Sequence, residues 1–347
     1  MKRSQLYMMI GGIAFISLLV TTVLWASPGN SDSLTEDGLQ PLEGLNSSLS
    51  EVVDRDPINE EEAGRGSVFS SNVPSNVVYV EQEISGVQFP EQMQFAGETV
   101  PLDIQDVAER LDREMLVNSY WHSNTILTLK LANKYLPEIE AVLAEKGVPA
   151  DFKYLAIAES GLRNLVSPAK AVGFWQILSS TGKSYGLEVT DQVDERYDYV
   201  KSTEAACDYL LEAYEKFGNW TLAAASYNMG MGGVSSRLKE QQVENYYDLY
   251  LNTETSRYVF RILALKHLFE NQELYGFSIT EDQLYQQEEF HEVEVSTSIS
   301  SLATYAKEQG TNYKTLKLLN PWLRSSGLTV SSGNSYTLRL PGSAPAN

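Results

Sequence analysis

Glu159 is the residue whose surroundings best fit acid chemistry in this sequence. It follows the apolar run 155–158, and on a helix its neighbours three and four residues back are Ala156 and Leu155. A carboxyl group against an apolar helix face loses hydration, which raises its pKa and lets it hold a proton near neutral pH. A general acid needs that proton in order to protonate a leaving oxygen. The alternative is a carboxylate at a helix end that faces solvent or pairs with Arg163.

The segment that follows, residues 161–186, has a composition typical of a ligand cleft. Its glycines and aromatic residues lie beside single polar groups, most densely in the Gly-Phe-Trp-Gln sequence at 173–176. Glycine lacks a Cβ atom and permits close approach of the backbone to a neighbour. We expect Phe174 and Trp175 to pack in the core rather than to form a platform for a sugar.

Helices must position these groups, because residues 101–275 show almost no strand-like alternation. Apolar side chains recur there at intervals of four residues, at Val107, Leu111 and Met115 and again at Leu127, Leu131 and Tyr135. A stretch of about 175 residues is long enough for one core. The fold class is therefore mainly α, with one all-α domain over 101–275.

Local signals place the ends of several helices. Pro137 is expected to open a helix in its first turn, and Asp151 is expected to cap the next helix, which ends near residue 160. Later helices are expected to start at Ser202 or Thr203, at Asn219 and at Thr253.

Charge and composition exclude several classes of protein. The net charge is -20, from 26 basic and 46 acidic residues, and more than half of it lies in residues 27–100. No excess of positive charge is present to neutralise phosphates, which argues against a nucleic-acid-binding protein. The one cysteine, Cys207, excludes a disulfide within the chain, and the three histidines are scattered. We expect no metal site and no cofactor.

The first 26 residues have the pattern of a membrane anchor. Lys2 and Arg3 precede an uncharged run from Leu6 to Trp25, and about twenty residues of helix match the bilayer core of about 30 Å. A cleaved signal peptide is the alternative. The two basic residues favour a cytoplasmic N-terminus, which places the rest of the chain outside the membrane.

Residues 27–100 are rich in polar and acidic residues and have no sustained apolar period. Such a composition buries too little apolar surface to offset chain entropy. We expect a disordered acidic linker; the alternative is a small acidic β-domain.

Three motifs carry a resemblance to a known family. They are Glu-Ser-Gly at 159–161, Gly-Phe-Trp-Gln at 173–176 and Ala-Ser-Tyr-Asn-Met-Gly at 225–230. Their order and spacing resemble those of the lytic murein transglycosylases of the lysozyme-like fold, in particular the membrane-bound murein transglycosylase D type. Residues 194–198 and 254–259 are also similar to that group, so the resemblance covers about residues 103–270.

The resemblance implies cleavage of the β-1,4 bond between N-acetylmuramic acid and N-acetylglucosamine in peptidoglycan, without water. Glu159 would protonate the glycosidic oxygen. The same carboxylate would then act as base while the muramoyl C6 hydroxyl attacks C1 and forms a 1,6-anhydro end. One carboxylate suffices because the nucleophile belongs to the substrate, whereas most glycoside hydrolases need two.

The resemblance also implies five substrate-binding residues. Ser160 matches the serine beside the acid, which orients substrate or carboxyl, and Gly173 with Gln176 matches the second motif. The side-chain amide of Gln176 can both donate to and accept from an N-acetyl group. Tyr227 and Asn228 match the third motif, where the tyrosine hydroxyl lies near the acid and the asparagine shapes the cleft.

Other polar residues are expected to be structural. Four acids near Arg196 would supply a hydrolase with its second carboxylate, but their density indicates a solvated loop or salt bridges with Arg196; they are Asp191, Asp194, Glu195 and Asp198. Cys207 is expected to be a core thiol. Tyr258 could line the cleft or pack between helices.

The C-terminal part changes character after a linker at 276–290. Residues 291–347 have a strand-helix-helix-strand pattern that resembles a LysM module, a peptidoglycan-binding unit. The usual Gly-Asp-Thr-Leu turn is replaced here by Ser-Ile-Ser-Ser-Leu at 298–302. Glycan binding and service as a packing lid both remain open for this LysM-like module.

These observations together predict a membrane-tethered peptidoglycan lytic transglycosylase on the periplasmic side of a bacterial cell envelope. The expected partners are glycan strands and the membrane, with no nucleic acid; the sequence names no protein partner. Two alternatives remain: a lysozyme-type hydrolase on the same fold, and a non-catalytic peptidoglycan-binding anchor.

Overall fold

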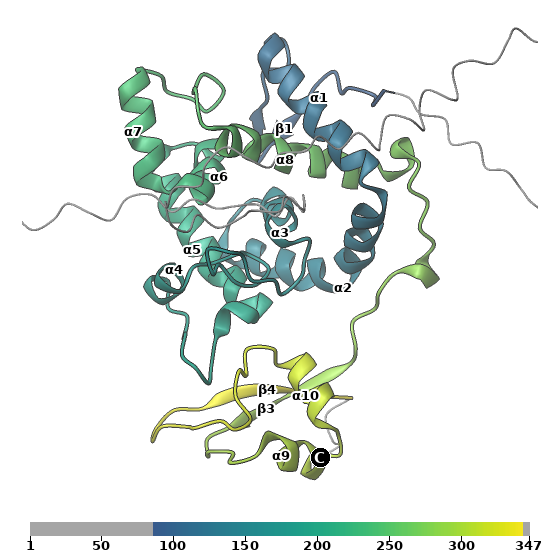
Figure 1. Ribbon diagram of the computed structural model, residues 1–347, viewed down its shortest axis with the longest axis vertical. Helices are drawn as coiled ribbons and strands as arrows, with labels where there is room; N and C mark the ends of the chain where they lie inside the picture. Colours follow the sequence, from purple (N-terminus) through teal and green to yellow (C-terminus); the bar gives the residue numbers. More distant parts are fainter. Residues whose placement is uncertain (1–85, 343–347) are drawn as a thin grey trace, which may run out of the picture. The chain divides into compact units, whose positions relative to one another are not determined.

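The computed structural model describes residues 86–342 of the chain (Figure 1). Among these residues no helix has both the length and the hydropathy needed to cross a membrane. The expected anchor at 1–26 and most of the expected linker lie outside the described residues.

The described part is mainly helical, as expected from the sequence. A short hairpin precedes the helices, formed by β1 (Gln94–Phe95) and β2 (Glu98–Thr99). The helices of the first domain are α1 (Gln105–Tyr120), α2 (His122–Lys146), α3 (Lys153–Ser160), α4 (Ser179–Ser184), α5 (Tyr199–Phe217), α6 (Trp220–Met229), α7 (Met231–Gln241) and α8 (Thr253–Glu270). Short 3-10 turns lie at Ala150–Phe152, Glu195–Tyr197, Gln272–Tyr275 and Glu281–Gln283.

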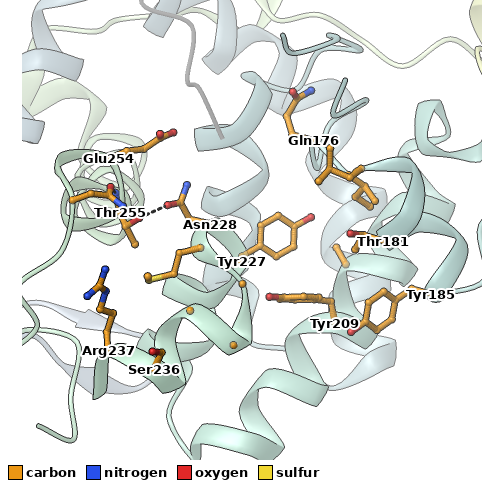
Figure 2. Close-up of a pocket in the computed structure, with 18 of the residues that line it drawn as sticks. Gln176, Thr181, Tyr185, Tyr209, Tyr227, Asn228, Ser236, Arg237, Glu254 and Thr255 are labelled. Carbon is orange, nitrogen blue, oxygen red and sulfur yellow. Dashed lines mark hydrogen bonds between the residues drawn. The ribbon is translucent and has the colours of Figure 1, made fainter. Parts of the chain in front are cut away.

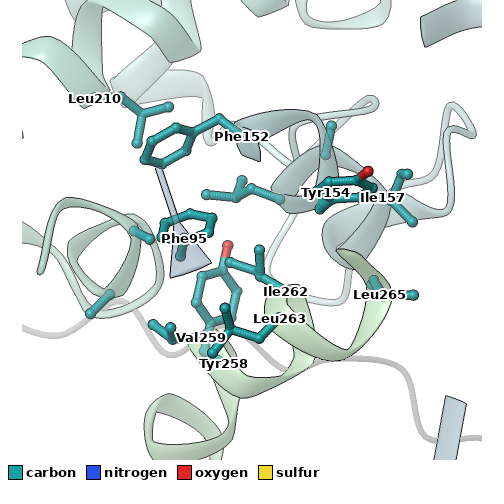
Figure 3. Close-up of a cluster of buried hydrophobic side chains, with 14 of the residues drawn as sticks. Phe95, Phe152, Tyr154, Ile157, Leu210, Tyr258, Val259, Ile262, Leu263 and Leu265 are labelled. Carbon is teal, nitrogen blue, oxygen red and sulfur yellow. The ribbon is translucent and has the colours of Figure 1, made fainter. Parts of the chain in front are cut away.

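Helix α3 lies at the centre of this domain (Figure 1). It contacts α8 and α2, and α8 in turn packs along α1 and α6. The side chains of Leu155 and Ala156 are fully buried. Phe95, Phe152 and Tyr258 belong to the same core (Figure 3). A short helix surrounded in this way holds its last residues in a fixed place.

Asparagine or aspartate side chains cap the starts of α5, α6 and α8. Asn219 accepts from the backbone N–H of Leu222 and starts α6 as expected. Helix α5 begins earlier than expected, at Tyr199, because Asp198 accepts from two backbone N–H groups and caps it. Each such cap contributes about 1 kcal/mol.

The expected helix start at Pro137 is wrong, because α2 runs through this residue. An interior proline costs about 3 kcal/mol through the lost hydrogen bond and the ring clash. Leu129 lies before the proline, Ile139 and Leu143 lie after it, and all three are buried. Each such burial contributes about 1.5–3 kcal/mol, which together outweighs the cost of the proline.

The helical domain also starts before residue 101, where the linker was expected to end. Phe95 of the hairpin is fully buried and packs edge-on against Phe152, with ring centroids 5.2 Å apart. The carboxylate of Glu98 accepts from the backbone N–H groups of Trp220 and Thr221, so it satisfies free donors at the start of α6. Residues 86–100 therefore belong to the folded domain.

The C-terminal module has the expected strand-helix-helix-strand order. Its elements are β3 (Phe290–Val295), α9 (Leu302–Glu308), α10 (Tyr313–Leu319) and β4 (Tyr336–Pro341). The two strands pair antiparallel, with Val293 opposite Leu338. Leu302, Leu316 and Leu338 lie in its small core.

Candidate active site

Glu159 lies in the last turn of α3, with its carboxyl group beside α8. Burial raises the pKa of Glu159 to about 7, and the negative charge of Glu254 acts in the same direction. A hydrogen bond from Tyr258 and the charge of Arg261 oppose this rise. The prediction that an apolar setting raises the pKa of this carboxyl is therefore confirmed. Arg163, the alternative partner, donates instead to the backbone oxygen of Ser160.

Tyr258 is a site residue that sequence reasoning left undecided. It lies on α8 and is buried, and its hydroxyl donates a hydrogen bond to Oε1 of Glu159. The two residues are 99 positions apart. No local pattern reports such a pairing; the only signal was the family-like stretch 254–259 that contains this tyrosine.

Ser160 uses its hydroxyl within the protein. The Ser160 Oγ lies 2.8 Å from the carbonyl oxygen of Phe174 and 3.3 Å from that of Ala156. It ties the end of α3 to the 173–176 turn, and its side chain is buried. The contacts of its hydroxyl are all with backbone atoms, so the expected role in orienting substrate or carboxyl stays a prediction.

Gly173 lies against the backbone of Arg196, which leaves no room for a side chain. Its φ is +86°, and a Cβ atom there would lie 1.9 Å from the carbonyl oxygen of Arg196. No side chain fits at that distance. The expected close approach is present, but the partner is the backbone at Arg196.

Gln176 is held inside the same turn and lies at the edge of a cavity. Its backbone has a φ of +47°, and its Nε2 donates to the carbonyl oxygens of Gly173 and Leu165 at 2.8 and 3.2 Å. The amide nitrogen is thus used by the turn. A ligand would meet this residue through its carbonyl oxygen.

A cavity of about 950 Å³ is lined by Tyr227 and Glu254, whose charges interact with Glu159, although Glu159 itself is not one of the lining residues. Tyr227 and Asn228 of α6 form one of its walls, with Gln176 and Thr181 on one side and Glu254 and Thr255 on the other (Figure 2). It is of the size of clefts that bind small organic ligands rather than a single ion.

Tyr227 and Asn228 are fixed by hydrogen bonds to two other elements. The Tyr227 hydroxyl donates to the carbonyl oxygen of Trp175 at 2.8 Å, and Asn228 Oδ1 accepts from Thr255 Oγ1 at 2.8 Å. Burial raises the pKa of Tyr227, and the charge of Glu159 raises it further. The tyrosine therefore lies within electrostatic reach of the acid, as the resemblance implied.

Glu254 is one of two carboxylates that line the cavity, together with Glu240, and neither was among the acids weighed from the sequence. Glu254 lies in the first turn of α8 and lines the cavity next to Thr255 (Figure 2). Its charge raises the pKa of Glu159. Sequence reasoning missed it because it follows a long loop and the residues directly beside it, Thr253 and Thr255, are polar.

The four acids near Arg196 are engaged elsewhere or exposed. Asp194 pairs with Arg196 at 2.7 Å, and both side chains are buried. Glu195 pairs with Lys201, and Asp198 caps α5. The expected salt bridge with Arg196 is confirmed, within a buried rather than a solvated loop.

A buried ion-pair cluster fixes α1 to α8 behind the acid. Glu114 of α1 is fully buried, and its carboxylate accepts from Arg257 Nε at 2.6 Å. Arg261 lies 4.0 Å from the same carboxylate. Because Arg261 also acts on Glu159, this cluster helps to set the electrostatics of the acid.

Metal or thiol chemistry has little support in the described residues. Between residues 86 and 342 no group of three or more His, Cys, Asp or Glu side chains could hold a metal ion. Cys207 is fully buried, and burial raises the pKa of its thiol to about 12. It is a core thiol, as expected.

Two segments of this chain match known protein families. Residues 137–249 match the family described as "Transglycosylase SLT domain". Residues 291–344 match the "Soluble lytic transglycosylase C-terminal LysM-like domain".

Two curated relatives are both described as "Membrane-bound lytic murein transglycosylase D", from Escherichia coli strain K12 and from strain O6:H1. Each is 30% identical over 254 residues, which are 70% of this chain and 54% of the relative. The chain therefore spans about half the length of these relatives. A solved structure of an inactive mutant of lytic transglycosylase Slt from Pseudomonas aeruginosa covers 44% of this chain and 26% of its own, with 18% identity and a TM-score of 0.32.

Proposed function

This chain carries a transglycosylase SLT domain and a LysM-like C-terminal domain, and we propose from them that it is a lytic transglycosylase that cleaves peptidoglycan. The observation that carries the proposal is Glu159, a carboxyl group with a pKa raised to about 7, which interacts electrostatically with Glu254 and Tyr227 on the wall of a cavity of about 950 Å³. Such a group is partly protonated at neutral pH and can give up and take back one proton.

The contacts of Glu159 suit both halves of that task. The hydrogen bond from Tyr258 occupies Oε1, so the acidic proton resides on Oε2, which is left for the glycosidic oxygen. When the proton leaves, the bond between C1 and the leaving oxygen breaks. The Tyr258 hydroxyl and the positive charge of Arg261 then stabilise the ionised carboxylate.

The second step returns the proton to Glu159. The carboxylate removes the proton of the muramoyl C6 hydroxyl while that oxygen forms a new bond to C1. No water enters, so the two products together have the mass of the substrate. Gln176, Tyr227 and Asn228 bind the sugars on the cavity wall, and Ser160 with Gly173 fixes the turn that carries Gln176.

The test is the mass of the products released from purified sacculi. Anhydro ends are expected for the parent protein, and no cleavage is expected for Glu159→Gln. Glu215→Gln is the matched control, since Glu215 is exposed on α5 and lies outside the cavity wall. Cleavage by Glu159→Gln at the parent rate would mean that another residue is the acid.

A lysozyme-type hydrolase is the second candidate, and Glu254 is the observation that favours it. A second carboxylate at the cavity could activate a water molecule. Reducing ends, heavier by one water, would then be released, and Glu254→Gln would abolish them. Under the lytic mechanism Glu254→Gln continues to release anhydro ends.

The LysM-like module is proposed to bind glycan. It contains a cavity of about 470 Å³ lined largely by hydroxyl-bearing residues of the 296–301 segment together with Thr304 and Tyr305. Hydroxyl groups both donate to and accept from sugars. Co-sedimentation of Glu159→Gln protein with sacculi tests this, and Tyr305→Ala is expected to weaken it. Binding without any cleavage by the parent protein would indicate a non-catalytic anchor.

Residues 1–26 are proposed to anchor the protein in the membrane, so that the enzyme acts on the periplasmic side. The support is the uncharged run after Lys2 and Arg3 and the membrane-bound description of the curated relatives. Deletion of residues 2–26 is expected to keep the protein out of the membrane fraction. A parent protein whose mature N-terminus lies beyond Ala26 would instead have a cleaved signal.

A further inference from the structure

We propose that the LysM-like module is a fixed brace for the turn at 170–177, in addition to any glycan it binds. This turn carries Gln176 at the edge of the active-site cavity. Two separate chains of contacts run from the module to the turn. The catalytic consequence rests on the function proposed above, whereas the structural brace does not.

The first chain of contacts starts inside the core of the module. Val193 belongs to the helical domain, yet it is buried among the apolar side chains of the module and pairs with Leu323 as a β-bridge. Next to it the backbone N–H of Asp194 donates to the carbonyl oxygen of Trp322 at 2.9 Å. The loop 188–197 is therefore held by the module through both its backbone and an apolar side chain.

The same loop contains Arg196, which contacts the turn at 170–177. Asp194 holds the Arg196 guanidinium through two hydrogen bonds of 2.9 and 2.7 Å. The Nη1 of Arg196 donates to the carbonyl oxygens of Ile177 and Lys170 at 3.1 and 3.2 Å. Its own carbonyl oxygen fills the space where a side chain at Gly173 would lie. Displacing the loop would thus remove several supports of the turn at once.

The second chain of contacts passes through Arg339 on β4. Its Nη2 lies 2.8 Å from the Glu138 carboxylate of α2, and its Nη1 donates to the Tyr199 hydroxyl at 2.9 Å. The Tyr199 ring stacks on Phe174 of the turn, with centroids 5.5 Å apart and planes at 23°. The module therefore also supports the turn from the side of its aromatic residue.

Two further contacts join the same surfaces. The guanidinium of Arg324 lies over the Tyr197 ring at 3.8 Å, and the Tyr336 hydroxyl donates to Glu188 at 2.9 Å. A module that moved freely on its linker would leave Val193 exposed and these polar groups unpaired. The combination of apolar burial and matched charges indicates one preferred position of the module on the helical domain.

The test is a charge swap across the Arg339–Glu138 pair in the full chain. Arg339→Glu and Glu138→Arg each place like charges opposite one another, and the double variant restores an attractive pair. Lys307→Glu is the matched control, because it makes the same charge change on the exposed side of α9. Far-UV circular dichroism checks that every variant is folded.

Two readouts separate a brace from a simple binding module. Hydrogen exchange of the peptide covering 170–177 reports the turn directly, and kcat on a soluble tetrasaccharide of alternating N-acetylglucosamine and N-acetylmuramic acid reports its effect. Each single variant is expected to exchange faster at the turn and to lose about tenfold in kcat, with KM changed little, because small misplacements of positioning groups cost this much or more. The double variant is expected to recover both values, and Lys307→Glu to keep them.

Unchanged exchange at 170–177 in both single variants would overturn the brace, as would equal losses in the double variant. A parent protein that cleaves no glycan would refute the proposed function alone, since the exchange measurement needs no substrate. Losses confined to insoluble sacculi, with parent kcat on the tetrasaccharide, would reduce the module to a binding unit.

Discussion

Replacing Tyr258 by phenylalanine tests how the acid is tuned. The change removes the hydroxyl that donates to Oε1 of Glu159 and leaves the ring in the core. That hydrogen bond favours the ionised carboxylate and lowers its pKa against the effect of burial. Without it, the pKa of Glu159 must rise above its present value of about 7.

The size of this change follows from the energy of the bond. A hydrogen bond to a charged group contributes about 1.5–3 kcal/mol, and about 1.4 kcal/mol corresponds to one pKa unit. Since Arg261 still stabilises the carboxylate, the lower end applies, and we expect a rise of about one unit.

The assay is the pH dependence of kcat/KM on a soluble oligosaccharide. The general acid must be protonated, so activity falls as pH rises through the pKa of Glu159. In Tyr258→Phe this limb should move about one unit to higher pH. Tyr154→Phe is the control, because its hydroxyl faces Glu270 at 3.4 Å instead. A limb that stays in place, or moves to lower pH, would refute this account of the site.

Three further substitutions test the surroundings of the site. Glu159→Gln should raise the free energy of unfolding at pH 8 but not at pH 4. The Glu159 carboxyl holds its proton more tightly in the folded state, so its ionisation lowers the free energy of unfolding as pH rises from 4.5 to about 7, by about 3 kcal/mol in total. Equal shifts of Tm at both pH values would contradict this. Gly173→Ala should destabilise the protein by about 3 kcal/mol or more in urea unfolding, because its Cβ would meet the Arg196 carbonyl oxygen; a neutral result would mean that the two segments separate easily. Glu114→Ala should cost about 3 kcal/mol, because it leaves the half-buried Arg257 without its partner. The double variant with Arg257→Met should recover part of that loss in the same measurement.

Local patterns were enough for the parts of the fold that depend on near neighbours. The four-residue spacing of apolar side chains along α1 marked a helix with one buried face, and Val107, Leu111 and Met115 are buried. The strand-helix-helix-strand order of the module was likewise readable. Where the local rule failed, as at Pro137, burial on both sides of the proline outweighed it.

The position and burial of Glu159 were also readable, because its apolar neighbours precede it on the same helix. The residues that lie opposite the acid could not be predicted from the sequence. Tyr258 and Glu254 come from α8, about a hundred residues later in the chain, and only the packing of α8 against α3 brings them to Glu159. A sequence can mark a residue as unusual, but it does not state the partner.

The sequence by itself thus determined the helical character of the domain and the apolar setting of the acid at the end of α3, since both rest on residues within one or two helical turns. It also contained the three motifs in order. Only the tertiary structure decided that Gly173 is required by Arg196, that Glu254 shares the cavity, and that the module reaches the turn through Val193 and Arg339. The physical reason is the range of the interactions: helix periodicity is a property of neighbouring residues, whereas excluded volume, ion pairing and desolvation act between any groups that folding brings into contact.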